Sequence, residues 1–351
     1  MKIVSLLIVL LVLIEGFAQS YEPLSIFQVS GSVKDLEIDE ENSLIYISSA
    51  QNTNVFNIEN NELHEIQINE KDLPEFRYYS KEFSQETNMV SDPESLRRSL
   101  FTENGDYLIF YWLEHQYEYL FVYKRNNMQY DLHRIFNNRA NANSVAVNRD
   151  LKLAVGSGGG QIRIWDIEDK NFVRLMKPEI SNGAVFSIQF SDINENKIII
   201  SNGASECIII DIETDQVYGS WKYGFSNGHG QQAMQMYLTN EDSLALVGLR
   251  NGYRNSLNIW ATTNEEAYSI STNIIEPIVF DITGSVLYIG DSSCYISVYN
   301  LLEGEISNVF TTGQYGLELL EFSNYGKYMV TTDGEGEIKV WRKNEFLTEP
   351  K

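Results

Sequence analysis

LKLAVGSGGGQIRIWD, residues Leu151 to Asp166, has the pattern of two short strands joined by a tight turn. Leu151–Val155 is an apolar run with alternating character, and Gln161–Trp165 alternates again, as half-buried strands require. The glycines from Gly156 to Gly160 predict the turn between them. An isolated hairpin is only marginally stable in water, so we expect the chain to supply more copies of this unit.

A polar turn between two apolar strands does recur along the chain. Its copies lie at Asp39–Ser43, Glu103–Asp106, Asn148–Asp150, Asn194–Asn196, Asn240–Asp242, Thr283–Gly284 and Asn324–Gly326. The last six are spaced by roughly 40 to 46 residues, the period of a four-stranded propeller blade. A second marker closes each third strand, namely Phe56, Tyr123, Trp165, Ile210, Trp260, Tyr299 and Trp341. We predict an all-β fold, a seven-bladed β-propeller of four-stranded antiparallel blades.

The two ends of the chain predict how the ring closes. The last repeat supplies three strands, Glu318–Phe322, Lys327–Thr331 and Glu337–Trp341, and then almost no chain remains. An unpaired ladder at that place would be an aggregation edge. The segment Ser25–Ser30, SIFQVS, reads as a strand without a blade of its own. We expect it to close the ring as the fourth strand of the last blade.

Residues 1–20 have the pattern of a secretory signal peptide. Lys2 is followed by the mainly apolar run Ile3–Ile14, and Gly16–Phe17–Ala18 offers small residues near a cleavage point. This run is shorter than the about 20 residues that a membrane-spanning helix needs. We expect a propeller domain over residues 21–351, without a membrane span, that is secreted or resides in the lumen of the secretory pathway.

The charge and the cysteine content narrow the function classes. Lys and Arg number 26 against 49 Asp and Glu, which gives a net charge of −23. Such a surface repels phosphate backbones, so we expect no nucleic-acid partner. The two cysteines, Cys207 and Cys294, fall in blades that are not neighbours, so we expect two unpaired thiols. We predict no metal and no cofactor.

Two stretches carry a family resemblance. Leu151–Asp166 and Tyr325–Trp341, YGKYMVTTDGEGEIKVW, resemble the strand, turn, strand and Trp-Asp pattern of the WD-repeat β-propellers. Gly228–His229 ahead of Trp260 is similar to the family's Gly-His to Trp-Asp unit. The resemblance implies structural roles in the repeats for Trp165, Asp166, His229, Trp260 and Trp341. It also implies a platform for protein partners.

The repeats depart from the family in most blades. Only Trp165 is followed by Asp, and the first, second, fourth and sixth repeats lack the tryptophan. The family's Asp-His-Ser/Thr-Trp hydrogen-bonded network is therefore incomplete in most blades. A looser class of seven-bladed propellers, similar to the bacterial surface and quinoprotein-like groups, stays open as an alternative.

Candidate binding residues lie where the repeats are interrupted. Residues 69–100 form an insertion between the first and second blades and include Phe76, Arg77, Tyr78 and Tyr79. The longest loops of the fifth blade include Tyr223, Phe225, Arg250, Tyr253 and Arg254. Aromatic residues and arginines are typical of interface hot spots. In a propeller, the loops between second and third strands and between successive blades share one face, and we expect partners to bind there.

Three features that resemble chemical sites have simpler interpretations. Alternating carboxylates in the segments that start at Asp166 and Asp211 can ligate calcium, but a polar hairpin turn is needed there anyway. Gly156–Gly160 lacks the Lys-Ser/Thr of a phosphate loop and leads into a strand. We predict no catalytic residues. The alternative is an extracellular propeller enzyme or small-ligand binder with its site at the mouth of the central channel.

Overall fold

The structure is a computed structural model, and within the residues it describes the regular elements are all strands. The described residues are 19–49, 52–68, 97–112, 119–137, 142–157, 159–169, 172–176, 184–191, 194–202, 206–222, 232–239, 244–251, 254–261, 267–270, 279–283, 286–290, 294–301, 303–314, 316–323 and 326–342. Hydrogen bonds join their strands into six sheets.

Three sheets consist of four consecutive antiparallel strands each. One contains β11 (Ala142–Val147), β12 (Lys152–Ser157), β13 (Ile162–Asp166) and β14 (Phe172–Met176). The next contains β15 (Val185–Phe190), β16 (Lys197–Asn202), β17 (Glu206–Asp211) and β18 (Val217–Lys222). The third contains β19 (Gln232–Thr239), β20 (Leu244–Asn251), β21 (Arg254–Ala261) and β22 (Ala267–Ile270). These sheets have the predicted four-stranded antiparallel form.

Two larger sheets add strands to the same plan. One contains β23 (Val279–Thr283), β24 (Val286–Gly290), β25 (Tyr295–Asn300) and β26 (Glu305–Thr311), with β1 (Gln19–Ser20) parallel to β26. The other contains β3 (Val33–Asp39), β4 (Leu44–Ser49), β5 (Thr53–Asn57), β6 (Glu62–Ile68), β7 (Arg97–Phe101), β8 (Tyr107–Trp112), β9 (Tyr119–Asn126) and β10 (Gln129–Asn137). We call β3–β6 the first unit and β7–β10 the second unit.

The first and second units are not separate sheets, which differs from the sequence prediction. Gln129 and Tyr130 of β10 pair in parallel with Gln67 and Ile68 at the end of β6. Both are the last strands of their units, so their free edges can pair with each other. Residues 69–96 of the predicted insertion lie outside the described residues, and its last four residues belong to β7.

The predicted closure by the N-terminal strand is present. β2 (Ser25–Gln28) pairs antiparallel with β29 (Glu337–Arg342), next to β28 (Tyr328–Asp333) and β27 (Leu317–Phe322). Phe27 of β2 also stacks on Phe56 of β5, with ring centroids 4.0 Å apart. The start of the chain therefore completes the sheet formed by its end and contacts the following sheet.

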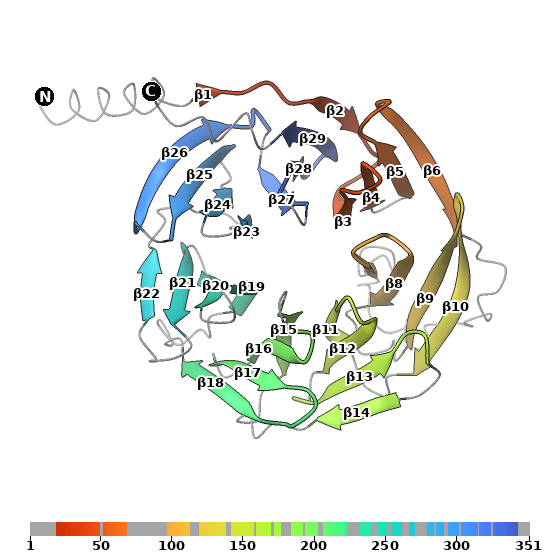
Figure 1. Ribbon diagram of the computed structural model, residues 1–351, viewed down its shortest axis with the longest axis vertical. Helices are drawn as coiled ribbons and strands as arrows, with labels where there is room; N and C mark the ends of the chain where they lie inside the picture. Colours follow the sequence, from red (N-terminus) through yellow and green to blue (C-terminus); the bar gives the residue numbers. More distant parts are fainter. Residues whose placement is uncertain are drawn as a thin grey trace, which may run out of the picture.

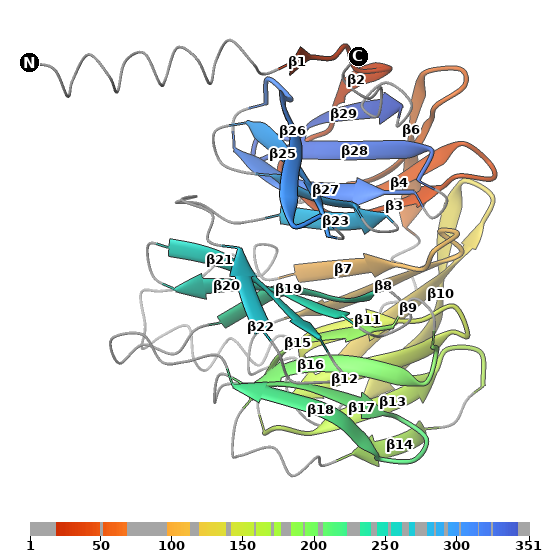
Figure 2. The same ribbon diagram turned by 60° about the vertical axis from the view of Figure 1, so that its left-hand side comes forward.

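The sheets are arranged around a central axis as in a propeller (Figure 1). The first strands of successive four-strand runs lie nearest to the axis, and neighbouring ones contact each other: β3 with β7, β7 with β11, β11 with β15, β15 with β19, β19 with β23, β23 with β27, and β27 with β3. The turned view shows the sheets stacked face to face around this axis (Figure 2).

The cores lie between neighbouring sheets, because each sheet buries both of its faces. Ile164 and Ile198, on adjacent sheets, belong to one buried cluster. Ile45 and Val330 join the first unit to the sheet of β27–β29 in another. Burial on both faces explains why β16 and β17 are buried over almost their whole length and carry the apolar runs Ile198–Ile200 and Cys207–Ile210.

The hairpin at Leu151–Asp166 forms as predicted. β12 and β13 pair antiparallel, and Ser157 N donates to Gln161 O at 2.9 Å across the turn. Gly160 has a φ of 72°, a conformation that favours glycine. Gly156 lies against Val185 of the next sheet, where a Cβ atom would approach Val185 Cγ1 to 2.5 Å. The glycines therefore make a turn and permit a close sheet contact.

Candidate functional site

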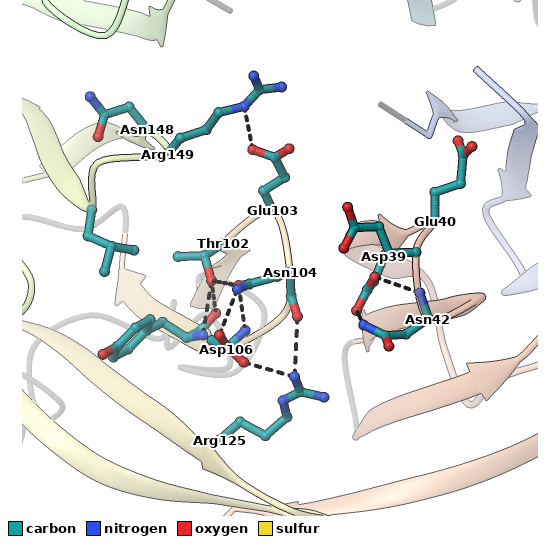
Figure 3. A pocket seen from close by; sticks show the side chains of 13 residues that line it. Asp39, Glu40, Asn42, Thr102, Glu103, Asn104, Asp106, Arg125, Asn148 and Arg149 are labelled. Carbon is teal, nitrogen blue, oxygen red and sulfur yellow. Dashed lines mark hydrogen bonds and ion pairs between the residues drawn. The ribbon is translucent and has the colours of Figure 1, made fainter. Parts of the chain in front are cut away.

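A cavity of about 500 Å³ opens among three of the polar turns (Figure 3). These turns join β3 to β4, β7 to β8, and β11 to β12. The lining residues are Asp39, Glu40, Glu41, Asn42, Thr102, Glu103, Asn104, Asp106, Tyr107, Arg125, Asn148, Arg149 and Leu151. We call this space the polar cavity.

The turn of the first unit presents a carboxylate-rich wall. Asp39 is almost fully buried, and its carboxylate accepts hydrogen bonds from Asn42 N at 3.1 Å and Asn42 Nδ2 at 2.8 Å. Glu40 turns the other way and accepts hydrogen bonds from Ser323 Oγ and, at 3.2 Å, from Lys327 N. The neighbouring sheet thus fixes one side of the cavity.

The turn of the second unit is held by its own side chains. Asn104 Oδ1 accepts from Asp106 N at 3.1 Å, and Asn104 Nδ2 donates to the Asp106 carboxylate at 2.6 Å. Gly105 between them has a φ of 65°, and a Cβ atom there would collide with the ring of Tyr46. Tyr130 Oη donates to Gly105 O at 2.5 Å. The turn is therefore pressed against the first unit.

The third turn connects two further units. Asn148 Nδ2 donates to Glu195 O at 2.9 Å, and Asn148 Oδ1 accepts from Lys152 N at 2.7 Å. Arg149 Nε lies 2.5 Å from Glu103 Oε2 of the second turn. Burial raises the pKa of Glu195, which faces Arg149, although the hydrogen bond from Arg149 N opposes the shift.

Arg125 forms the floor of the polar cavity. Its Nη2 atom lies 2.8 Å from Asp106 Oδ1, and its Nη1 atom donates to Tyr46 Oη. The guanidinium carbon lies 4.9 Å from the centroid of the Tyr46 ring. Burial raises the pKa of Tyr46 to about 12, although the Arg125 charge opposes the shift. The phenol is therefore neutral at physiological pH and serves as the acceptor for Arg125.

Sequence reasoning identified these turns but did not treat them as a site. Asp39–Ser43, Glu103–Asp106 and Asn148–Asp150 were markers of the repeat, and partners were expected on the opposite face. The available signal was composition: each turn combines Asp, Asn or Glu in a fold where the same ends of successive units meet.

Most of the predicted binding residues lie outside the described residues. These are Phe76, Arg77, Tyr78, Tyr79, Tyr223, Phe225 and Tyr253, together with the predicted structural His229. Arg250 and Arg254 lie in the main-chain ladder at the end of the β20–β21 hairpin, where Arg250 pairs with Asn255 and Arg254 with Asn251. The hairpin is present, and its role in binding stays a prediction.

Two of the predicted structural tryptophans, Trp165 and Trp341, have described side-chain contacts. Trp165 on β13 packs on Phe136 of β10, with ring centroids 4.9 Å apart. Trp260 takes its predicted place on β21. Trp341 Nε1 donates to Thr331 Oγ1 at 3.0 Å, and Thr331 in turn contacts Gln314. Gln314 is therefore hydrogen-bonded to the Trp341–Thr331 pair inside the sheet of β27–β29.

The alternating carboxylates act as turn acceptors. Asp211 Oδ1 accepts from Glu213 N and Thr214 N at 2.9 and 2.8 Å. Asp166 accepts from the amides of Glu168 and Asp169 and from Lys152 Nζ at 2.5 Å. Burial alone raises the pKa of Asp166, but these hydrogen bonds outweigh it and hold the pKa below its usual range. Across the described ranges, no group of three His, Cys, Asp or Glu has a metal-binding arrangement.

Asp35 is a titratable residue that sequence reasoning did not single out. It lies on the inner strand β3, and its Oδ2 atom accepts from Phe101 N of β7 at 2.7 Å. The residue keeps some accessible surface, yet burial of its carboxyl raises the pKa to about 8, against the effect of that hydrogen bond. Burial and the nearby Asp35 charge raise the pKa of Tyr111 to about 12.

Comparisons with known proteins show the fold and no more. No protein-family model matches the chain, and no curated protein matches it. The crystal structure of Raptor from Chaetomium thermophilum aligns with a TM-score of 0.68 at 11% identity, over 93% of this chain and 29% of that one. The similarity supports an all-β fold of the propeller type. Since 1721 solved chains match in total, the likeness identifies an architecture shared by many proteins.

The chain spans less than a third of the Raptor chain to which it is similar. In the part of the chain that the structure describes, no helix is long and apolar enough to cross a membrane.

Proposed function

We propose that this protein is a scaffold that binds protein partners on the face of a seven-bladed β-propeller. The observation that carries the proposal is the propeller fold, in which apolar cores join neighbouring sheets and leave the connecting turns at the two faces. A rigid frame that presents loops is suited to binding, because the loops can vary without loss of the core.

The contacts of the inner strands support a count of seven blades. Each of β3, β7, β11, β15, β19, β23 and β27 begins a run of four strands or, for β27, a run completed by β2. Neighbours in this series contact each other all the way round. On this count, the eight-stranded sheet is two blades joined at their outer edges. β1 (Gln19–Ser20) lies within residues 1–20, which the proposed signal-peptide cleavage removes, so it is not counted as part of the sixth blade.

Residues 1–20 support entry into the secretory pathway, so we place the scaffold in the lumen or outside the cell. The test is the mass of the protein recovered from the culture medium of expressing cells. We expect the recovered protein to be smaller than the full-length chain by the mass of about 20 residues, the length of the signal peptide. Full-length protein that stays inside the cell would contradict the proposed location.

The proposed binding surface is the β20–β21 hairpin of the fifth blade, together with Phe76–Tyr79, Tyr223 and Phe225. We expect Tyr253→Ala combined with Arg254→Ala to weaken recovery of partners in a pull-down while leaving the melting temperature unchanged. A matched control replaces Tyr218 and Lys222, an exposed aromatic and an exposed cation on β18. Equal recovery by the wild type and both variants would exclude this surface.

A second candidate function, an enzyme or small-ligand binder at the channel mouth, is favoured by Asp35. A carboxyl with a pKa near 8 on an inner strand is a candidate for proton transfer or for hydrogen bonding to a ligand. The test is a thermal-shift screen of small molecules against the wild type and Asp35→Asn. A compound that stabilises only the wild type supports this function, and the absence of any such compound argues for the scaffold.

A further inference from the structure

We propose that the seam between the first and second units binds an extended peptide that carries a basic side chain and, close to it, an aliphatic one. This site opens on the face opposite to the one proposed for partner docking. It does not depend on that docking surface.

The polar cavity has an excess of negative charge. Five of its lining residues are carboxylates, and its two arginines are already committed: Arg125 to Asp106 and Arg149 to Glu103. Asp39 and Glu41 have no ion-pair partner among the described residues, and Glu41 is exposed, whereas Glu40 interacts with the charge of Lys327 outside the cavity lining. A guanidinium or ammonium group is the ligand chemistry that complements such a wall.

The polar cavity stays open because its two walls are held by different neighbours. Glu40 is bonded toward the sheet of β27–β29, whereas Glu103 is bonded toward Arg149 of the third turn. Arg125 links the two units, because it reaches Tyr46 on one side and Asp106 on the other. The gap is therefore part of the fold.

A second, mainly apolar cavity of about 170 Å³ lies in the same seam. It is lined by Leu44, Tyr46, Val55, Asn57, His64, Ile66, Arg125, Asn127 and Met128. Arg125 lines both cavities, and it contacts the ring of Tyr46, which lines the apolar one. Met128, in the turn between β9 and β10, is 46% exposed.

The two cavities together favour a peptide over a free cation. The polar cavity lies within the size range of ligand pockets, whereas the apolar one has room for a single aliphatic side chain. In an extended chain, side chains two residues apart project to the same side about 7 Å from each other. A basic residue and an aliphatic residue at that spacing can enter adjacent cavities at the same time.

The test is fluorescence anisotropy with the purified full-length protein and a labelled probe peptide, Gly-Ser-Arg-Gly-Leu-Ser-Gly. We expect saturable binding, which Glu41→Lys weakens about tenfold because it places a cation in the polar cavity. The control is Glu213→Lys, the same charge change at an exposed turn of another sheet, which leaves the affinity unchanged. Glu41→Gln, which preserves the shape of the side chain, shows a smaller loss in the same direction.

The apolar cavity is tested separately. We expect Met128→Ser, or replacement of the probe leucine by serine, to weaken binding, whereas Val173→Ser leaves it unchanged. Val173 is a fair control because it is 49% exposed on the outer strand β14 and lines neither cavity. Absence of saturable binding overturns the proposal. Equal losses for Glu41→Lys and Glu213→Lys would also overturn it, because the probe would then respond only to the net charge of −23.

Discussion

The indole nitrogen of Trp341 donates a hydrogen bond of 3.0 Å to the hydroxyl oxygen of Thr331, and both side chains are almost completely buried. Gln314 contacts the same hydroxyl and donates to Glu337 O at 2.8 Å. The bonds connect β28, β29 and the segment before β27. These buried hydrogen bonds stabilise the sheet in which β2 pairs with β29, the last described strand.

Thr331→Val should lower the free energy of unfolding by about 1–3 kcal/mol, because it removes the acceptor of a buried donor. Thr332→Val is the matched control. Thr332 is equally buried, but its hydroxyl has no hydrogen-bond partner in the described structure. Replacing that hydroxyl by a methyl group should leave stability unchanged or raise it. Urea denaturation of both variants checks the pair, and equal losses would contradict the role of the Trp341 bond.

Gly105→Ala should be much more destabilising than Gly316→Ala. Both glycines have positive φ angles, 65° and 74°, so both substitutions carry a backbone cost of about 1–2 kcal/mol. At Gly105 the new Cβ also meets the ring of Tyr46, whereas nothing lies within 4 Å of the corresponding position at Gly316. Overpacking adds about 1–3 kcal/mol at Gly105. Similar melting temperatures for the two variants would refute the close contact between the units.

Removal of β2 should destabilise the propeller. A chain that begins at Gly31 lacks the pairing of Ser25–Gln28 with β29 and the stacking of Phe27 on Phe56. Phe27→Ala should reproduce part of the loss, and Ile26→Ala should have little effect, because Ile26 is 56% exposed. Thermal melting followed by circular dichroism measures all three. A shortened chain with unchanged stability would show that β2 is dispensable.

Asp35 should make the protein less stable as the pH rises through about 8. The pKa of its carboxyl is raised from 3.8 in the unfolded chain to about 8 in the folded one, so the folded state holds a proton that the unfolded state releases. This contribution is present in full below pH 3.8 and is lost as the pH approaches 8. Unfolding free energies of the wild type and Asp35→Asn, compared at several pH values, should diverge over this range. Parallel curves would rule out a raised pKa.

The strand pattern could be predicted from the sequence because the apolar and polar residues of each strand depend on which of its faces are buried. Alternation, glycine turns and closing aromatics place β12, β13, β28 and β29 within one or two residues. The pairing of β6 with β10 was not predictable. It depends on the free edges of two outer strands, and the side chains of Gln67 and Tyr130 carry no pattern that marks it.

The site could be predicted only in part for a related reason. The polar turns are visible in the sequence, but a turn that completes a hairpin and a turn that lines a cavity use the same residues. What distinguishes them is the direction in which neighbours hold each turn, such as Glu40 toward Ser323 and Glu103 toward Arg149. Those contacts connect residues far apart in the chain.

The pairing of β2 with β29 has a consequence for biosynthesis. Ser25 must wait for Val340, its partner, which is synthesised about 315 residues later. At roughly 5–20 residues per second, this delay is on the order of tens of seconds. During that time Phe27 has neither its partner strand nor a completed sheet to cover it. We expect the nascent chain to expose Phe27 to chaperones until then, and the fold to become protease-resistant only after Glu337–Val340 has been synthesised.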